Sequence, residues 1–334
     1  MLVLKKPYLL YLGDAKLELD CKTAFGLRDW CRDAVLAEWS HPNGTVTLGL
    51  PRLAPREAAA KGAGSLIVGV APTGGALPEH WQGDLEAALD AGLDLVSGMH
   101  TRLTSFPRLV AAAARSGARL IDVRHTGGPY PCATGRRRTG KRVLTVGTDC
   151  ALGKKYTALA LTQALKAKGL AATFRATGQT GIMIAGAGVA MDATVSDFIA
   201  GAAEVLSPDN APGHWDVIEG QGSLFHPAYA AVTLGLLHGS QPDAIVLCHD
   251  PTRTTIDEYP DYPIPPLKEV IAEYLRSSLT HRGVRCVGLA INSSALDEAA
   301  WTAYRTTTGR ELGLPVCDPL RGGVGPLADA LAAL

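Results

Sequence analysis

Residues 143–168, VLTVGTDCALGKKYTALALTQALKAK, constrain the fold of this chain more than any other stretch. A short apolar run typical of a strand ends at Gly147, and an Ala- and Leu-rich run typical of a helix follows Gly153 and Lys154. A strand, a glycine loop and a helix in this order direct backbone N–H groups and a helix N-terminus at one point, which suits a phosphate. The stretch therefore predicts a phosphate-binding loop to which Lys154 adds a positive charge.

The spacing of this loop departs from the usual signature G-x-x-x-x-G-K. Five residues, TDCAL, separate Gly147 from Gly153, and the next position after Lys154, where a Ser or Thr hydroxyl normally holds Mg²⁺, is Lys155. Thr157 lies about 200° round the helix from Lys155, so it does not simply replace the missing ligand. We expect a phosphate cradle with an extra cation and a weakened magnesium site. Such a cradle suits a nucleotide that is not cleaved, such as coenzyme A.

A second glycine-rich stretch, TGQTGIMIAGAG at residues 177–188, follows the next predicted strand. Turns of this kind sense the state of a bound phosphate in related folds, and a plain flexible turn is the alternative. The two stretches together supply the candidate residues for binding the donor, which are Gly147, Thr148, Asp149, Cys150, Gly153, Lys154, Lys155, Tyr156, Thr157, Gln179 and Thr180.

Composition limits the class of protein. The 334 residues include 47% hydrophobic and 19% charged residues, enough for two domains with large cores. Lys+Arg and Asp+Glu both number 32, which argues against a nucleic-acid or acidic-membrane binder. Seven cysteines without a C-x-x-C pair fit a reducing compartment, and the sequence shows neither a long apolar run nor a signal-peptide pattern. We expect a cytoplasmic enzyme with a small-molecule substrate and, although no pattern specifies it, a homo-oligomer.

Strand and helix patterns alternate along the chain, which predicts α/β domains with parallel sheets. The expected strands are 7–12, 45–48, 65–70, 93–97, 119–123, 143–146, 171–176, 215–218, 243–248, 285–291 and 315–318. The expected helices are 22–37, 55–62, 84–91, 106–115, one ending at 168, 195–204, 267–278, 296–306 and 327–334. The basic, Gly- and Pro-rich stretch 129–142 separates two domains, 1–138 and 139–334.

Parallel sheets bind ligands at the carboxyl ends of their strands. In the first domain, loops starting at Ala71, Gly98 and Arg124 lie at such ends, so polar residues there are candidates for substrate contacts, with a structural role as the alternative: His100, Arg102, Arg124 and His125. The basic run 136–138 is expected to be a solvated linker, or else to reach the 3′-phosphate of coenzyme A.

Two residues after the predicted strand 215–218 are candidates for acid–base chemistry. Glu219 opens the turn EGQG at the strand end, where an acidic group near a phosphate loop usually orients Mg²⁺ or water. Without a hydroxyl at Lys155, Glu219 is freer to accept a proton. His226 lies seven residues on and is either a second general base or a packing residue. Gln221, in the same turn, is a candidate substrate contact.

The strand 243–248 ends in HDPTR, which places Asp250 and Arg253 on the same edge as candidates for substrate binding. Arginine suits a carboxylate because its planar fork matches two oxygens. Asn292 ends the strand 285–291, where it could read an adenine ring or simply form a turn.

The loop GTDCALGK resembles that of dethiobiotin synthetase-type enzymes, which implies a P-loop NTPase-like second domain. The blocks FRATGQTGI, SDFIAGAAEVLSPDNAP, HWDVIEGQGSLFHP and LCHDPTRT, with PYLLYLGDA, VGVAPTGG, SGMHTRL and DVRH before them, resemble the bacterial D-glutamate N-acetyltransferase family over almost the whole chain. The resemblance implies a Rossmann-like N-terminal domain and acetyl transfer from acetyl-CoA to the amine of D-glutamate, in D-amino-acid catabolism.

Three functions remain open at this point. In an acetyltransferase, the loop holds the pyrophosphate of acetyl-CoA, Arg124 or Arg253 binds substrate carboxylates, a glycine turn donates N–H groups to the oxyanion, and Glu219 or His226 takes the proton, with no metal. A Mg-ATP-dependent ligase or kinase of dethiobiotin synthetase type explains the loop length but not Lys155. A nucleotide-binding regulatory module would bind without turnover.

Overall fold

The computed structural model describes residues 3–70, 76–125, 129–281 and 283–334. The chain divides into two compact units, of which the first comprises Met1–Gly128 and Gln179–Ala190, and the second Pro129–Gly178 and Met191–Leu334. Along the chain, the two units therefore meet between Gly128 and Pro129, whereas the basic stretch predicted a domain boundary after residue 138. The division also groups the short segment Gln179–Ala190 with the first unit, whereas sequence order assigns that segment to the second domain.

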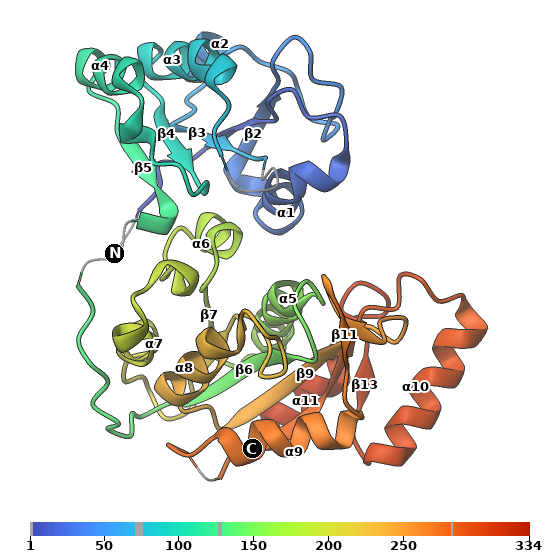
Figure 1. Cartoon of the computed structure of the whole chain (residues 1–334). Helices are drawn as coiled ribbons and strands as arrows, with labels where there is room; N and C mark the ends of the chain where they lie inside the picture. Colours follow the sequence, from blue (N-terminus) through green and yellow to red (C-terminus); the bar gives the residue numbers. More distant parts are fainter. Residues whose placement is uncertain (1–2, 71–75, 126–128, 282) are drawn as a thin grey trace. The chain divides into compact units, whose positions relative to one another are not determined.

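The first unit is built on a five-stranded parallel sheet in the order β2-β1-β3-β4-β5 (Figure 1). Its strands are β1 (Tyr8–Tyr11), β2 (Val35–Trp39), β3 (Ser65–Val68), β4 (Asp94–Ser97) and β5 (Leu120–Asp122). Its helices are α1 (Lys22–Trp30), α2 (Pro55–Ala60), α3 (Gln82–Asp90), α4 (Pro107–Ser116) and α6 (Gln179–Ala185). The strand order reverses between β1 and β3, as in the Rossmann-like folds expected from the sequence.

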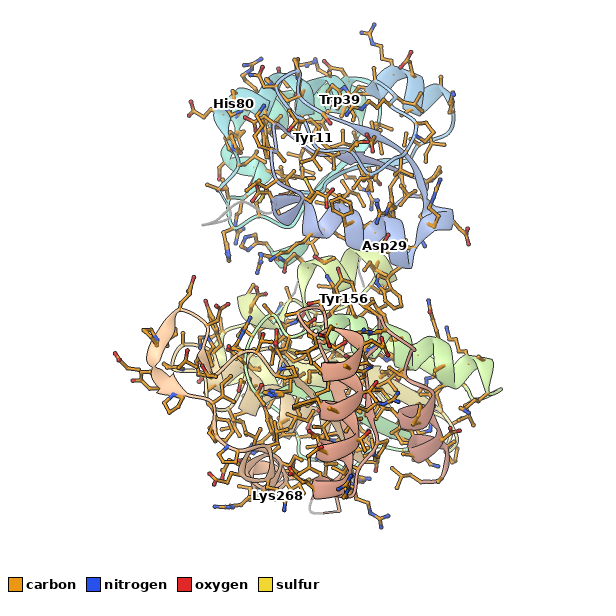
Figure 2. The ribbon with its side chains drawn as sticks, turned by 90° about the vertical axis from the view of Figure 1, so that its right-hand side faces the viewer. Tyr11, Asp29, Trp39, His80, Tyr156 and Lys268 are labelled. Carbon is orange, nitrogen blue, oxygen red and sulfur yellow. The ribbon has the colours of Figure 1, made fainter. Side chains whose placement is uncertain are left out.

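The core of the first unit explains one wrong prediction. The expected helix 22–37 ends at Trp30, and Val35–Trp39 instead forms β2 beside β1. In β2, Trp39 packs on the fully buried Tyr11 of β1, with the two ring centroids 5.2 Å apart (Figure 2). The expected strand 45–48 is also wrong, since these residues form a loop whose Leu48 N–H donates to the buried carboxylate of Glu38 at 2.6 Å.

The stretch 177–188 is not the glycine-rich turn that the sequence predicts. Gln179–Ala185 forms α6, in which residues 180–184 are all buried. This helix packs against α1 within the first unit, where the hydroxyl oxygens of Thr23 and Thr180 lie 2.9 Å apart. Burial of the apolar side chains outweighs the cost of a glycine inside a helix, which is about 1 kcal/mol.

The second unit contains a six-stranded parallel sheet in the order β13-β12-β9-β6-β8-β7 and a separate hairpin, β10-β11. The strands are β6 (Lys141–Gly147), β7 (Ala172–Arg175), β8 (Trp215–Ile218), β9 (Ala244–His249), β10 (Thr255–Ile256), β11 (Tyr259–Pro263), β12 (Arg285–Ile291) and β13 (Val316–Cys317). The helices are α5 (Lys154–Ala167), α7 (Ile199–Leu206), α8 (Ala230–Ser240), α9 (Leu267–Ser277), α10 (Glu298–Leu312) and α11 (Gly325–Ala332).

Helices cover both faces of this sheet. Val143 of β6 and Val246 of β9 share one buried cluster with Leu161 of α5 and Leu327 of α11. On the other face, α8 contacts β6 and α9 contacts β12 (Figure 1). α8 was not predicted from the sequence, because it is apolar on most sides and has almost no amphipathic pattern. No helix in the described residues is long and apolar enough to cross a membrane.

The basic stretch before β6 is not solvated throughout. Arg138 is 6% exposed and its guanidinium donates to the backbone carbonyls of Glu204, Gly239 and Ser240. Burial lowers the pKa of Arg138 to about 10. These bonds tie the start of β6 to the ends of α7 and α8, so this arginine is committed to the fold rather than to a 3′-phosphate.

Strand pairing brings the candidate segments to one edge of the second unit. Gly147, the last residue of β6, pairs with Cys248 of β9, and Leu144 pairs with Ile218, the last residue of β8. The loops that begin at Thr148, Glu219 and Asp250 therefore leave neighbouring strands at their carboxyl ends, as the sequence predicted.

Candidate active site at the phosphate-binding loop

The loop between β6 and α5 is a closely packed turn. A Cβ at Gly147 would lie 2.9 Å from the carbonyl oxygen of Asp149 and 3.0 Å from Nζ of Lys154. A Cβ at Gly220, in the turn after β8, would lie 1.7 Å from the carbonyl oxygen of Thr145, so this position also requires glycine. The two glycines let the EGQG turn and the loop approach the side chain of Lys154.

Lys154 is the first residue of α5 and only 7% exposed. Its ammonium donates to the carbonyl oxygen of Asp149 at 2.6 Å. Burial lowers the pKa of Lys154, because the charged form loses its hydration. An anionic group bound at the loop would compensate this desolvated charge, as in other phosphate-binding loops.

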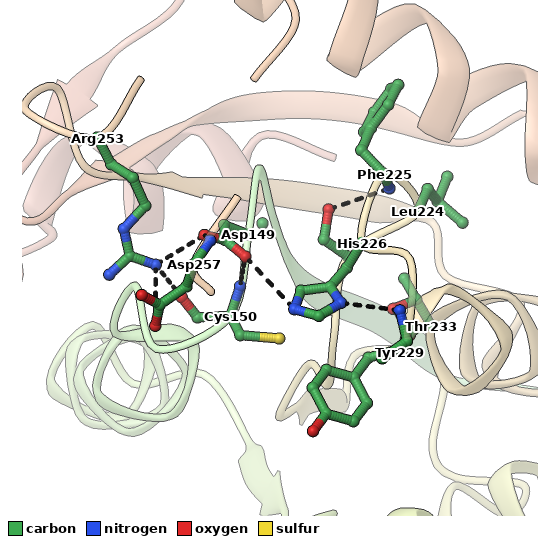
Figure 3. A network of polar contacts seen from close by, with 12 residues as sticks. Asp149, Cys150, Leu224, Phe225, His226, Tyr229, Thr233, Arg253 and Asp257 are labelled. Carbon is green, nitrogen blue, oxygen red and sulfur yellow. Dashed lines mark hydrogen bonds and ion pairs between the residues drawn. The ribbon is translucent and has the colours of Figure 1, made fainter. Parts of the chain in front are cut away.

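Asp149 stabilises the conformation of the loop through hydrogen bonds, which Figure 3 shows. Its fully buried carboxylate accepts hydrogen bonds from Nη1 of Arg253 and from the N–H of Asp257, both at 2.8 Å, and from the N–H of Cys150 at 2.6 Å. Arg253 also donates to the carbonyl oxygen of Cys150 at 2.9 Å. In this structure the guanidinium of Arg253 fixes the loop, and its role as a substrate clamp stays a prediction.

His226 faces Asp149 from the turn after β8, with Nε2 4.0 Å from Oδ1 (Figure 3). Its Nδ1 accepts the N–H of Ala228 at 3.1 Å. A backbone N–H can only donate, so Nδ1 carries no proton and the neutral ring has its proton on Nε2. His226 is thus an N–H donor toward the loop, which disfavours its use of Nε2 as a base.

Donor atoms of Asp149, Cys150 and His226 lie within 4.8 Å of one another, a set of O, S and N donors that resembles a zinc site. The tautomer of His226 does not fit such a site. A ligating Nε2 needs a free lone pair and therefore a proton on Nδ1, where the Ala228 N–H already points. The carboxylate of Asp149 is also occupied by three N–H donors.

Glu219 is a buried carboxylate in a fixed position. It is 4% exposed, and its Oε2 accepts the N–H of Thr177 at 2.8 Å and the N–H of Gly178 at 3.1 Å. The hydroxyl of Thr177 donates to the carbonyl oxygen of Glu219 at 2.7 Å and accepts from Nε2 of Gln221 at 2.9 Å. Burial raises the pKa of Glu219, while the hydrogen bonds from Thr177 and Gly178 and the positive charge of Lys155 lower it in part. A carboxylate with a raised pKa is a better proton acceptor.

His249, Tyr274 and Thr145 also support the loop, and none of them was predicted for that role from the sequence. The Oγ1 of Thr148 lies 3.0 Å from Nδ1 of His249, a residue whose burial lowers its pKa to about 4. The hydroxyl of Tyr274 in α9 donates to the carbonyl oxygen of Gly147 at 2.8 Å, and burial raises its pKa to about 12. The hydroxyl of Thr145 accepts the N–H of Gly220 at 2.9 Å. The strand-end position of His249 was a detectable signal, whereas nothing in the sequence around Tyr274 indicates this contact.

A pocket of about 160 Å³ opens beside the start of α5. Its lining includes Gly153, Tyr156, Thr157, Asn292, Asp318 and Leu320. Asn292 donates to the carboxylate of Asp250 at 3.2 Å, and Asp250 also accepts the N–H of Thr252 at 3.0 Å. Asp250 therefore organises its own loop and positions Asn292 at the pocket.

The remaining candidates belong to the first unit. Nε of Arg124 donates to the carbonyl oxygen of Gly98 at 2.8 Å, and a ring nitrogen of His125 lies 3.3 Å from the carbonyl oxygen of His100. The charge of Arg124, with burial and His125, lowers the pKa of His100. Arg102 is exposed, and Gln179 begins α6 in the same unit. The predicted loop 71–75 and residues 126–128 lie outside the described residues.

The loop, its lysine and the buried carboxylate lie in a region that matches a known protein family. Residues 131–328 match a family model described as domain of unknown function (DUF1611_C) P-loop domain, and residues 40–126 match one described as domain of unknown function (DUF1611_N) Rossmann-like domain. The chain belongs to the DUF1611 family. The two models confirm the fold class predicted for each half of the sequence.

Full-length relatives of this DUF1611 protein carry an enzymatic name. A protein of Tritonibacter scottomollicae named D-glutamate N-acetyltransferase is 47% identical over 99% of this chain and 100% of its own length. A protein of a Pseudoalteromonas species with the same name is 43% identical over 98% of this chain and 99% of its own length. A crystal structure of a DUF1611 family protein from Anabaena variabilis superposes with a TM-score of 0.87 at 36% identity, covering 99% of this chain and 100% of that one.

Proposed function

We propose that this protein transfers the acetyl group of acetyl-CoA to the amino group of D-glutamate. The observation that carries the proposal is the similarity, at 43–47% identity over nearly the whole chain, to two proteins named for this reaction. The site chemistry agrees with it, because a phosphate-binding loop stands beside a buried carboxylate and a lysine replaces the usual Mg²⁺ ligand.

In this mechanism the phosphate-binding loop holds the pyrophosphate of the donor, with Lys154 as the counter-charge. The pocket lined by Tyr156 and Asn292 adjoins the loop and suits the adenine end. Because His226 keeps its proton on Nε2, Glu219 is the better of the two candidate bases. The Nε2–H of His226 adds a donor for developing negative charge.

The transfer itself needs one proton acceptor. Glu219 removes a proton from the substrate ammonium, and the amine nitrogen then attacks the thioester carbonyl carbon. A C–N bond forms and the C–S bond breaks, so that coenzyme A leaves as a thiolate. The thiolate takes up the second proton, which the attacking nitrogen loses as it becomes an amide, and the first proton passes from Glu219 to solvent. Gln221 and Arg253, which belong to the same unit as Glu219, are the proposed contacts for the carboxylates of the substrate. Substrate contacts by Arg102 and Arg124 stay predictions from the sequence.

The test of this function is the rate of coenzyme A release from acetyl-CoA across D- and L-amino acids, with and without EDTA. We expect the fastest release with D-glutamate and no effect of EDTA. Substrate-dependent ADP release from Mg-ATP would instead identify a ligase or kinase. Nucleotide binding without turnover of any amino acid would identify a regulatory module.

Thr177 is expected to position Glu219. Thr177→Val removes the hydroxyl that donates to the Glu219 carbonyl and accepts from Gln221, while preserving shape. We expect kcat to fall by about ten-fold, the value of one buried hydrogen bond. The hydroxyl is one of the groups that lower the pKa of Glu219, so the acid limb of the kcat/KM profile should move to higher pH. Thr177→Ser should restore both, and an acid limb that does not move in the valine variant would contradict this role.

A further inference from the structure

The P-loop family implies a magnesium ion beside the phosphate-binding loop. That ion is normally held by a Ser or Thr hydroxyl directly after the loop lysine and is oriented by an acidic residue at the end of a neighbouring strand. Here the acidic residue is present as Glu219, at the end of β8 beside β6, but the hydroxyl position is Lys155. The chain thus presents an ammonium where the signature presents a metal ligand.

Neither Thr157 nor Thr148 supplies the magnesium ligand that is lost where Lys155 replaces the Ser or Thr of the signature. Thr157, 1% exposed, donates to the carbonyl oxygen of Gly153 at 3.1 Å, and its hydroxyl is 3.5 Å from the sulfur of Cys248. Thr148 is fully buried and pairs with His249. Mg²⁺ requires near-octahedral oxygen coordination, so these residues do not fit the ion.

One oxygen of the Glu219 carboxylate is already engaged by the protein. Its Oε2 already accepts two backbone N–H groups, from Thr177 and Gly178. Burial raises the pKa of Glu219, and the positive charge of Lys155 acts against that rise. Nζ of Lys155 lies 4.8 Å from the centroid of the Tyr156 ring, and Tyr156 lines the pocket beside the loop.

We propose that the ammonium of Lys155 takes the place of the magnesium ion at this loop, so that a pyrophosphate-bearing donor binds without a divalent cation. The identity of the donor as acetyl-CoA rests on the proposed function, whereas the charge replacement applies to any nucleotide diphosphate group. A fixed ammonium supplies charge without polarising a leaving phosphate, which agrees with a loop that binds its nucleotide but does not cleave it.

Binding of coenzyme A and of ADP, measured by calorimetry with excess EDTA or excess MgCl₂, tests this replacement. The unchanged protein should bind each ligand equally well in both conditions. Lys155→Thr, which restores the hydroxyl of the signature, should bind about ten-fold more weakly in EDTA, the loss expected for one charge-assisted contact, and should regain affinity with Mg²⁺. Lys155→Met should lose affinity without regaining it, and Lys155→Arg should retain most of it.

Weaker binding of the unchanged protein in EDTA, or unchanged affinity in Lys155→Met, would overturn the proposal. A thermal unfolding midpoint near that of the unchanged protein shows that each variant is folded, and retained binding by Lys155→Arg shows that the loop tolerates substitution. Mg²⁺-independent binding without acetylation of D-glutamate would overturn the proposed function alone. Failure of the unchanged protein to bind either ligand would overturn both.

Discussion

Replacing Glu219 with glutamine is expected to lower kcat by about 10²- to 10⁴-fold, the usual contribution of a positioned general base. Glutamine has the same shape, and its amide oxygen can still accept the N–H groups of Thr177 and Gly178 that now bind Oε2. The variant therefore loses the proton acceptor but keeps the turn. Steady-state acetyl transfer measures the loss in kcat, and calorimetry should show donor affinity almost unchanged.

The pH profile provides a second measure of the same role. Burial raises the pKa of Glu219, so the unchanged enzyme should lose activity as the pH falls through that raised pKa and protonates the base. This acid limb should disappear in Glu219→Gln. The control is Glu269→Gln, at an exposed carboxylate in the first turn of α9, which should change neither kcat nor the profile. Normal turnover by Glu219→Gln would place the base elsewhere.

The buried parallel strands could be predicted most accurately from the sequence. The strands 215–218 and 285–291 have the bounds predicted for them, because strands covered on both faces are short continuous apolar runs. The loop before α5 was equally readable, since its glycines and lysine are close in sequence. Local signals of this kind specify where a phosphate-binding loop lies.

The helices α6 and α8, whose formation depends on tertiary packing, were not predicted from the sequence. α6 contains Gly181, and its sequence looks like a turn, yet its apolar residues are buried within the first unit. α8 has apolar residues on most sides because it lies under α7 and against the sheet, and so lacks the periodicity that marks a helix. In both cases tertiary contacts outweigh local propensity.

The contacts within the site could not be predicted from the sequence either, because they join residues that are far apart along the chain. Arg253 lies 104 residues from Asp149 along the chain, and only the folded sheet reveals that the two form an ion pair at 2.8 Å. The position of the proton on His226 depends on the N–H of Ala228, which donates to Nδ1 because of the conformation of the turn after β8. Residue types thus indicated which groups could act, and the structure indicates how those groups are already engaged.

Replacing Lys154 with alanine is expected to weaken coenzyme A binding by more than about ten-fold, because a charge-assisted contact is worth roughly 1.5–3 kcal/mol. Lys154 is only 7% exposed and its ammonium points into the loop, so few water molecules can substitute for a phosphate there. Burial lowers the pKa of Lys154, so the affinity of the unchanged protein should also decline as the pH rises through that lowered value. Calorimetric titration with coenzyme A measures both effects.

The matched control is Lys166→Ala, an exposed lysine in the last turn of the same helix, α5. It removes the same charge from the protein but leaves the loop intact, so the affinity for coenzyme A should not change. If Lys154→Ala binds as tightly as the control, the loop does not grip the pyrophosphate. A loss of affinity confined to Lys154→Ala, with a pH dependence that vanishes in that variant, would tie donor binding to this one buried ammonium.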